Sequence, residues 1–209
     1  ASELTGKAAQ TPRALARPRF MSSKGLTPAE RGTALHQFMQ FAEYGAANTD
    51  AKAECDRLLA RGYLTPEQAQ AVDFARVQAF FDSDLGRRIL QAQTVEKEKR
   101  FMVELPLAAV QAELLPELQQ QCTVLQGAVD CVFAEEDGLV IVDFKTDREK
   151  DPQALWERYC TQLELYAYAM EQVYQKPVKR CVLYSFYLNK AVAGAWERKF
   201  VVDKLEENC

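Results

Sequence analysis

Two neighbouring stretches in the middle of the chain carry the clearest pattern of apolar and polar positions. In the first stretch, one face holds Leu125, Gly127, Val129, Cys131 and Phe133, and the other face carries Asp130. The second stretch, 139–146, is apolar and rich in β-branched residues, with Asp143 and Lys145 set into it. Such patterns are typical of strands. Because residues 135–138 between them read Glu-Glu-Asp-Gly and favour a turn, the pattern predicts an antiparallel hairpin.

The predicted hairpin brings three charged side chains together. Asp143 and Lys145 share a face because they are two positions apart on a strand. A two-residue loop, 137–138, would place Asp130 opposite Lys145, whereas a four-residue loop, 135–138, would place it opposite Asp143. In either register the three groups lie on one face, about 5–7 Å from their nearest neighbours. Charges in otherwise apolar strands are costly unless they bind something.

A divalent cation is one such binding partner. Paired carboxylates suit Mg²⁺ or Mn²⁺, which keep several waters and bridge to phosphate oxygens. Lys145 has no acceptor, so it suits charge stabilisation or the positioning of a water beside the metal. The competing interpretation is a structural salt bridge of Lys145 with Asp143 or Asp130.

Helical periodicity dominates the first part of the chain. The sequence Thr27-Pro28-Ala29-Glu30 predicts a helix start with an N-cap, a first-turn proline and a capping box. The helix carries His36, the chain's single histidine, beside an apolar stripe, where a structural role is the more common one. Gly32, one turn earlier, would let another backbone or a ligand come close. Further helices are predicted over 51–61, 65–81 and 85–90.

The remaining pattern predicts strands around one long helix. Residues 94–103 form a charged strand with poor alternation, which favours an edge position. A helix is predicted from 152 to 174, with Gln162 inside its buried stripe, and strands follow over 178–188 and 196–202. Residues 105–121 are ambiguous, and 1–25 read as an irregular arm. This order predicts an α/β fold with a mixed sheet, a crossover helix and a helical N-terminal part.

Composition narrows the class of protein. The chain has 209 residues, of which 48% are hydrophobic and 27% charged, and no apolar run approaches a membrane span. Six cysteines are scattered singly, which favours free thiols in a reducing cytoplasm over zinc or iron–sulfur ligands. The net charge is −4, although the arm is basic and reads as a solvated linker. The start at Ala1 rather than Met suggests a fragment or a processed chain.

Several known motifs are absent and others are present. The sequence has no phosphate-loop, dinucleotide-binding or nucleophile-elbow motif. Its Gly-Ala-Val-Asp at 127–130, followed by Asp-Phe-Lys at 143–145, resembles the PD-(D/E)xK nuclease superfamily, in particular its RecB-like branch. Three more motifs of that branch occur in order, at 32–36 (Gly-x-x-x-His), 98–101 (Glu-x-x-Phe) and 162–166 (Gln-x-x-x-Tyr). The resemblance covers 17–190, and the flanking residues are most similar to the nuclease domains of AddA-type helicase–nucleases.

The resemblance implies a restriction-endonuclease-like core over 26–209 and assigns roles to individual residues. The implied metal ligands are His36, Asp130, Asp143 and the backbone carbonyl of Phe144. The implied catalytic lysine is Lys145, and Gln162 and Tyr166 would line the site and hold the DNA strand. Glu98 would either orient His36 or lie near the metal. Phe144 departs from the tyrosine of many relatives, but because its carbonyl is the expected ligand we expect the site to remain competent.

The resemblance further implies a function and partners. The chain would be a cytoplasmic, Mg²⁺-dependent deoxyribonuclease of exonuclease type, with Mn²⁺ as an alternative ion, in double-strand break repair and recombination. Single-stranded DNA would be delivered by the helicase portion of the same longer chain. An AddB-type subunit would be the partner, and no membrane would be involved. The alternatives are a RecB-like exonuclease without a helicase, a non-catalytic module for DNA binding or subunit docking, and a soluble α/β domain with a buried ion pair.

Overall fold

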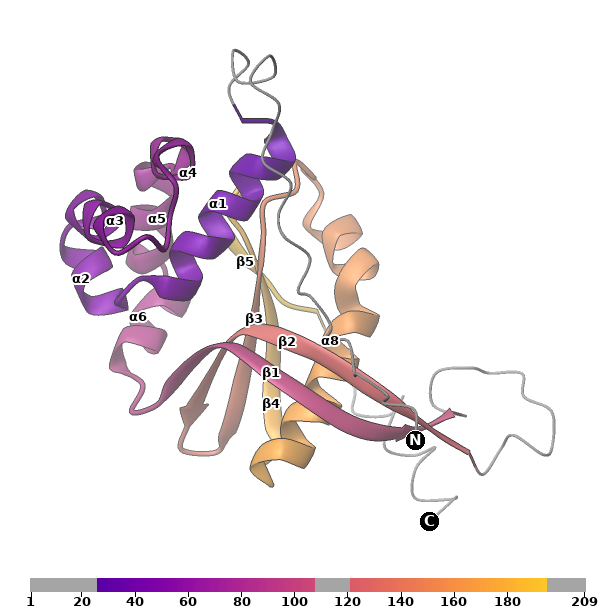
Figure 1. Cartoon of the computed structure of the whole chain (residues 1–209). Helices are drawn as coiled ribbons and strands as arrows, with labels where there is room; N and C mark the ends of the chain where they lie inside the picture. Colours follow the sequence, from indigo (N-terminus) through magenta and orange to yellow (C-terminus); the bar gives the residue numbers. More distant parts are fainter. Residues whose placement is uncertain (1–25, 108–120, 195–209) are drawn as a thin grey trace, which may run out of the picture.

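The computed structural model describes residues 26–107 and 121–194, and its elements follow one another as helices, a hairpin ribbon, one long helix and a final strand pair (Figure 1). The helices are α1 (Pro28–Phe41), α2 (Tyr44–Thr49), α3 (Ala51–Ala60), α4 (Pro66–Ala71), α5 (Phe74–Asp82), α6 (Asp84–Gln91) and α8 (Pro152–Tyr174). The strands are β1 (Val95–Pro106), β2 (Cys122–Glu135), β3 (Gly138–Lys145), β4 (Val178–Ser185) and β5 (Lys190–Val192).

The strands form one mixed sheet in the order β1-β2-β3-β4-β5. The β1–β2, β2–β3 and β4–β5 pairs are antiparallel, whereas β3 and β4 are parallel and are joined through α8. A parallel pair needs a crossover connection, and α8 supplies it. The predicted mixed sheet, its crossover helix and the edge position of β1 are therefore confirmed.

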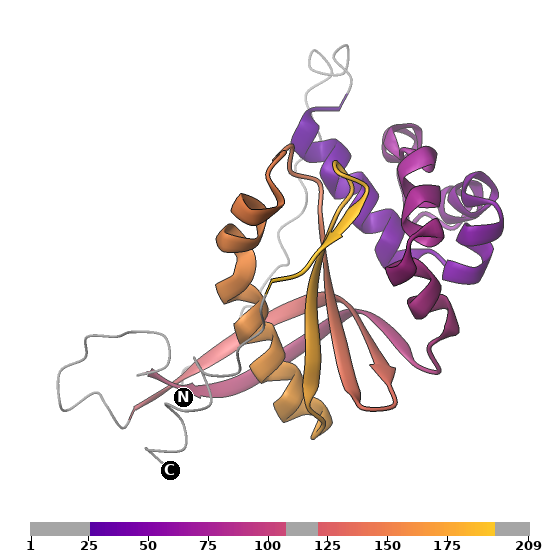
Figure 2. The same cartoon turned by 180° about the vertical axis from the view of Figure 1, so that it is seen from behind.

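Helices cover the two faces of the sheet unequally. Helices α1–α6 lie on one face and α8 lies on the other, which the two opposite views show (Figures 1 and 2). On the first face, the ring of Phe80 meets Phe144 and Tyr184 edge-on, with centroids 5.4 and 4.8 Å apart. On the second face, buried residues of α8 such as Leu163 pack on strand residues such as Ile141. The end of β3 therefore lies between two apolar cores.

Local signals in the sequence explain where the principal helices begin. Thr27 accepts a hydrogen bond from the Glu30 amide, and the Glu30 carboxylate accepts one from the Thr27 amide at 2.7 Å. This capping box satisfies two otherwise unpaired amides at the start of α1. Asp151 caps α8, and that helix covers the predicted range, 152–174. The stripe of α1 is buried, with Ala34 and Phe38 fully covered.

Some predicted elements were wrong in extent. The single helix expected over 65–81 is two helices, because Asp73 caps a new helix by accepting from the Arg76 amide at 3.2 Å. Helix α2 and strand β5 were not predicted, and β4 ends at Ser185 rather than at 188. The expected arm at 1–25, most of the ambiguous segment and the strand expected at 196–202 lie outside the described residues.

The hairpin register corresponds to one of the two alternatives. Cys131 pairs with Val142 and Glu135 pairs with Gly138, which aligns Asp130 with Asp143. The loop is nevertheless only two residues long, 136–137. Gly138 has a φ of +148°, and a Cβ there would lie 2.5 Å from the carbonyl oxygen of Pro177, so a side chain would be strained.

The predicted alternation along β2 was wrong at one point. Leu125 and Val129 pack in the core beneath α8, but Cys131 and Phe133 pack in the core beneath α1–α6. The strand pair β1–β2 therefore changes faces between Val129 and Cys131. Glu98 stands opposite Asp130 on β1, has a φ of +48°, and interrupts the ladder between the Lys97 and Lys99 pairs. This backbone twist, which no apolar pattern reports, exchanges the two faces.

Three of the scattered cysteines lie in the core of the described part of the chain. Cys55, Cys131 and Cys181 are buried free thiols, as expected of cysteines that act as small hydrophobes. Across the described ranges, none of the helices combines the length and the apolar character required to cross a bilayer.

Candidate active site

The predicted site residues gather where the pairing of β2 with β3 stops. The ladder ends at Cys131 and Val142, one position before Asp130 and Asp143. Helix α1 passes close to this point because Gly32 has no side chain. A Cβ on Gly32 would lie 2.5 Å from Oγ1 of Thr146, the residue that follows β3. This close approach brings His36, one turn further along α1, to the carboxylates.

Asp143 is the most buried acid of the cluster. It is 4% exposed, and its Oδ2 lies 2.7 Å from Nζ of Lys145. Apart from this ion pair, Oδ2 has no hydrogen-bond partner among the described residues. Burial and the neighbouring charge of Asp130 raise the pKa of Asp143 to about 6, although Lys145 opposes them. The carboxylate is therefore short of favourable partners.

Asp130 connects the two strands with the helix. Its Oδ2 accepts a hydrogen bond from the amide of Phe144 at 2.8 Å and lies 3.5 Å from Nδ1 of His36. Burial lowers the pKa of His36, but the contact with Asp130 and the charge of Asp143 raise it by more, so the net direction is upward. The imidazole is thus held by its carboxylate neighbour.

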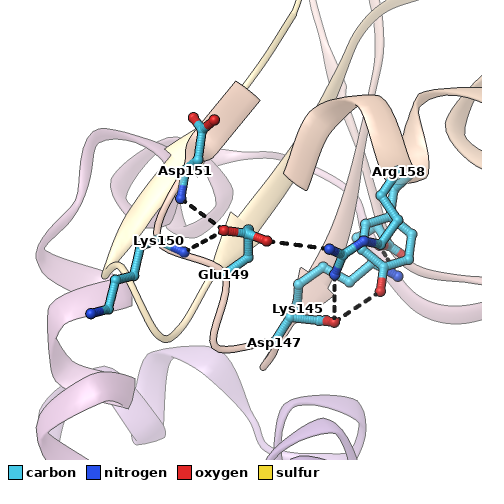
Figure 3. A network of polar contacts seen from close by, with 8 residues as sticks. Lys145, Asp147, Glu149, Lys150, Asp151 and Arg158 are labelled. Carbon is cyan, nitrogen blue, oxygen red and sulfur yellow. Dashed lines mark hydrogen bonds and ion pairs between the residues drawn. The ribbon is translucent and has the colours of Figure 1, made fainter. Parts of the chain in front are cut away.

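Lys145 is positioned by a tyrosine that the sequence pattern did not single out. Its Nζ lies 3.8 Å from the centroid of the Tyr159 ring, a distance typical of a cation–π contact. The hydroxyl of Tyr159 donates to Asp147 at 3.1 Å, and Arg158 reaches both Asp147 and Glu149 (Figure 3). The signal that could have found Tyr159 is its place one helical turn before Gln162 in α8.

Gln162 and Tyr166 lie on α8 near this cluster. The Gln162 amide donates to the Tyr166 hydroxyl at 2.7 Å, and both side chains are partly buried. Burial raises the pKa of Tyr166, and the charges of Asp143 and Asp130 also act on it. Its ring meets Phe101 of β1 edge-on at 5.7 Å. Tyr166 therefore lies within electrostatic range of the carboxylates, while the role of the pair stays a prediction.

Glu98 remains the least defined of the predicted residues. It lies on β1 opposite Asp130 of β2 and is partly buried. Among the described residues, its carboxylate forms no hydrogen bond or ion pair with His36. The expectation that Glu98 orients His36 therefore has no support from contacts.

The donor set fits a hard divalent cation, although it does not form a complete cage. Asp143 Oδ2 is buried without a hydrogen bond, and an oxygen of Asp130, an imidazole and the Phe144 carbonyl lie on neighbouring elements. Carboxylate and carbonyl oxygens suit Mg²⁺ or Mn²⁺, whereas an imidazole is more typical of transition-metal ions. Within residues 26–107 and 121–194, however, no three His, Cys, Asp or Glu side chains converge as a cation site. The proposed ligand set therefore stays a prediction.

Three curated relatives share this region of sequence, and each is named as a subunit of an ATP-dependent helicase/nuclease. The protein of Geobacillus kaustophilus is 42% identical over an alignment of 181 residues, and the match covers 81% of this chain and 14% of that one. The protein of Bacillus cereus (strain Q1) is 42% identical over an alignment of 188 residues, with 84% of this chain and 15% of that one covered. For Clostridium novyi the identity is 36% over an alignment of 188 residues, with 87% of this chain and 15% of that one covered. The chain thus spans about one seventh of the length of these relatives.

The comparison with protein families covers almost the whole sequence. The profile described as PD-(D/E)XK nuclease superfamily matches residues 9–207 of the 209. In the described part of the chain, the mixed five-stranded sheet with helices on both faces agrees with the expected restriction-endonuclease-like α/β fold. On this match, the chain belongs to the PD-(D/E)XK nuclease superfamily.

Proposed function

We propose that this chain is a metal-dependent DNA nuclease domain that hydrolyses phosphodiester bonds. The observation that carries the proposal is the buried Asp143–Lys145 ion pair beside Asp130 and His36. Carboxylates gathered in this way repel phosphate, so work on DNA requires a cation at this point. Membership of a nuclease superfamily supports the reaction class.

Each residue of the cluster has a distinct task in this proposal. Asp130 and Asp143 would hold the cation, with His36 and the Phe144 carbonyl completing its protein ligands. When bound, such an ion supplies Lewis-acid activation of a phosphate oxygen and of a water. Burial lowers the pKa of Lys145, but Asp143 raises it by more, so the ammonium stays charged. That charge would stabilise the negative charge that develops on the phosphate oxygens.

The helix behind the strands would hold the substrate. The Gln162 amide donates to the Tyr166 hydroxyl, and both groups would exchange that contact for contacts with the strand. The ring of Tyr159 would keep the Lys145 ammonium aimed at the reacting phosphate. Positioning of this kind contributes to catalysis because a displaced charge loses much of its effect.

We infer the finer details of substrate and partners from the named relatives. Their names describe ATP-dependent helicase/nuclease subunits, and the matched region is only 14–15% of their length. A chain of that kind would deliver single-stranded DNA from its helicase portion to an exonuclease-type site that uses Mg²⁺, with Mn²⁺ as a substitute. It would act with an AddB-type subunit in double-strand break repair and recombination.

The test is cleavage of labelled single-stranded and double-stranded DNA with Mg²⁺, Mn²⁺ or EDTA. We expect cleavage in the presence of a metal, its loss in Asp143→Ala, and its retention in Asp84→Ala, which removes an exposed carboxylate of α6. Circular dichroism would confirm that both variants fold. Cleavage that persists in Asp143→Ala would overturn the site. A folded wild-type chain that cleaves neither substrate would favour the non-catalytic module instead.

A further inference from the structure

A second feature lies next to the candidate active site. A cleft of about 410 Å³ is bounded by the first turns of α1, the α4–α5 junction and the residues after β3. Three of the side chains that line it are arginines: Arg31, Arg76 and Arg148. Two aspartates, Asp73 and Asp147, also line it. The charge balance of the cleft therefore depends on how these acids are paired.

Both aspartates are neutralised by basic groups. Asp73 Oδ2 lies 3.1 Å from Nε of Arg76, within the α5 helix start. Asp147 Oδ1 lies 3.5 Å from an Nη of Arg158 and accepts from Tyr159, so its charge is directed toward α8. The acids thus do not cancel the remaining arginines of the cleft.

Arg31 and Arg148 retain donors for a ligand. Both are exposed, and within the described residues Arg31 donates through Nε to the carbonyl oxygen of Leu26, at 3.2 Å. Among the described residues, Arg148 forms no ion pair or hydrogen bond. A guanidinium offers several donors in a planar fork that matches a phosphate group. The cleft accordingly suits an anion with phosphate geometry.

The segment that carries Arg148 is held in place rather than free. On either side of it, Asp147 and Glu149 both bond to Arg158 of α8, and Glu149 also accepts from the amides of Lys150 and Asp151 (Figure 3). A ligand bound by Arg148 would therefore meet a backbone that is already ordered, which reduces the entropy lost on binding.

The cleft joins the candidate active site directly. Gly32 and Thr146 both line it, and they are the pair whose close contact brings α1 to the end of β3. Thr146 follows Lys145, and Gly32 is one turn from His36. A polymer with phosphates on both sides of the reacting position would pass from the carboxylates into the cleft.

We propose that this arginine-lined cleft binds the phosphodiester backbone of the nucleic-acid strand on one side of the scissile phosphate. Arg31 and Arg148 would contact the phosphates, and they would set how far the strand extends past the site. The inference rests on the proposed nuclease function, because it takes the reacting phosphate to lie at Asp130 and Asp143. A free phosphate ion shares the same chemistry as a single backbone phosphate, so the test must separate the two.

The experiment measures binding without cleavage, by fluorescence anisotropy of a labelled oligothymidylate in EDTA at several salt concentrations. The variant is Arg31→Ala with Arg148→Ala, and the control is Arg61→Ala, an exposed arginine at the end of α3. We expect the double variant to bind about tenfold more weakly. The slope of the logarithm of its binding constant against the logarithm of salt concentration should be smaller by about one to two, because fewer counterions are released from the DNA. We expect the control to stay within about twofold of the wild type. Unchanged affinity and salt slope in a folded double variant would overturn the inference.

Two further readouts separate the outcomes. Inorganic phosphate should displace the labelled oligonucleotide only at concentrations far above those at which an unlabelled oligonucleotide does so. Displacement by both competitors at the same concentration of phosphate groups would indicate a site for a single ion, and it would overturn the proposal that the cleft binds a nucleic-acid strand. In cleavage assays with metal, the double variant should raise KM and leave kcat nearly unchanged. If the wild type cleaves and the arginine variant binds and cleaves as the wild type does, the inference fails while the proposed function stands. If the wild type does not cleave, the proposed function fails, whatever the binding result.

Discussion

A single aromatic ring decides how Lys145 is presented. Tyr159 places its ring 3.8 Å from the ammonium and its hydroxyl 3.1 Å from Asp147. We predict that Tyr159→Phe, which keeps the ring, cleaves DNA within about threefold of the wild type, since only one partly buried hydrogen bond, to Asp147, is lost. Tyr159→Leu removes the ring and should cleave about tenfold more slowly, because a partly buried cation–π contact contributes about 1–2 kcal/mol.

Single-turnover cleavage rates at saturating metal would compare the two variants. Thermal unfolding of each would exclude loss of the fold as the cause. Equal rates for Tyr159→Leu and the wild type would mean that the ring has no part in holding Lys145.

The backbone of Glu98 is the second feature at this scale. A glutamate with a φ of +48° costs of order 1 kcal/mol, and such strain tends to persist at functional positions. We predict that Glu98→Asn raises the free energy of unfolding by about 0.5–1 kcal/mol, because asparagine tolerates this region of φ, whereas Glu98→Gln leaves it nearly unchanged. Urea unfolding would measure both.

The same two variants test whether the Glu98 carboxylate takes part in cleavage. If Glu98 acts near the metal, both variants should lose cleavage, although only one of them relieves the strain. Cleavage at the wild-type rate in Glu98→Gln would remove Glu98 from the site. A lower stability in Glu98→Asn would contradict the assignment of strain.

Among elements, the contact of α1 with the end of β3 depends on one missing side chain. In Gly32→Ala, the new Cβ would meet Thr146 Oγ1 at 2.5 Å, so α1 or Thr146 must move. The gain in helix propensity, about 1 kcal/mol, opposes this cost. We predict a net loss of about 1–2 kcal/mol in the free energy of unfolding and a larger loss of cleavage, because His36 moves with the helix.

A double variant tests whether the contact with Thr146 Oγ1 causes the loss of stability in Gly32→Ala. Thr146→Ala removes Oγ1 and leaves the Thr146 Cβ at 3.5 Å from the new atom, an ordinary contact. Gly32→Ala combined with Thr146→Ala should therefore recover most of the stability that Gly32→Ala loses. An additive result in this double-mutant cycle would show that the two positions do not interact.

Elements that local chemistry specifies were predicted from the sequence, and elements that distant contacts specify were not. The capping box of α1 and the N-cap of α8 depend on residues three or fewer positions apart, so the chain itself reveals them. The split at Asp73 was missed because the apolar period continues across it, although Asp73 is itself a capping residue. The switch of faces opposite Glu98 was missed because a backbone angle causes it.

The residues of the candidate site divide in the same way, into those that local spacing predicts and those that distant contacts place. The spacing of Asp143 and Lys145 predicted their proximity, since alternation along a strand is local. The sequence pattern left the register at Asp130 open, and the structure aligns it with Asp143. Tyr159 lies on another element, and its place one helical turn before Gln162 in α8 is the one hint in the sequence that it belongs to the site. Tertiary packing alone supplies that contact.

On the scale of the whole molecule, one carboxylate joins both halves of the fold. Glu135, at the end of β2, accepts from Arg88 of α6 at 2.8 Å and lies 2.6 Å from Nζ of Lys179 on β4. The hydrogen bond from Arg88 is the main cause that lowers the pKa of Glu135 to about 2, and Lys179 adds to it. Because the side chain is 24% exposed, solvent screening reduces the stabilisation to about 1–2 kcal/mol.

Because the pKa of Glu135 is lower in the folded state than in the unfolded state, its contribution to stability is lost as the pH falls. The stabilisation is complete above the unfolded value of 4.5 and disappears as the pH falls toward about 2, because the proton then binds both states equally. We predict that Glu135→Gln lowers the free energy of unfolding at pH 7 by about 1–2 kcal/mol and flattens its decline between about pH 4.5 and 2. Glu136→Gln, in the exposed loop next to it, should change neither quantity. Urea unfolding across this pH range would measure both variants, and an unchanged acid limb in Glu135→Gln would show that this contact does not couple α6 to the sheet.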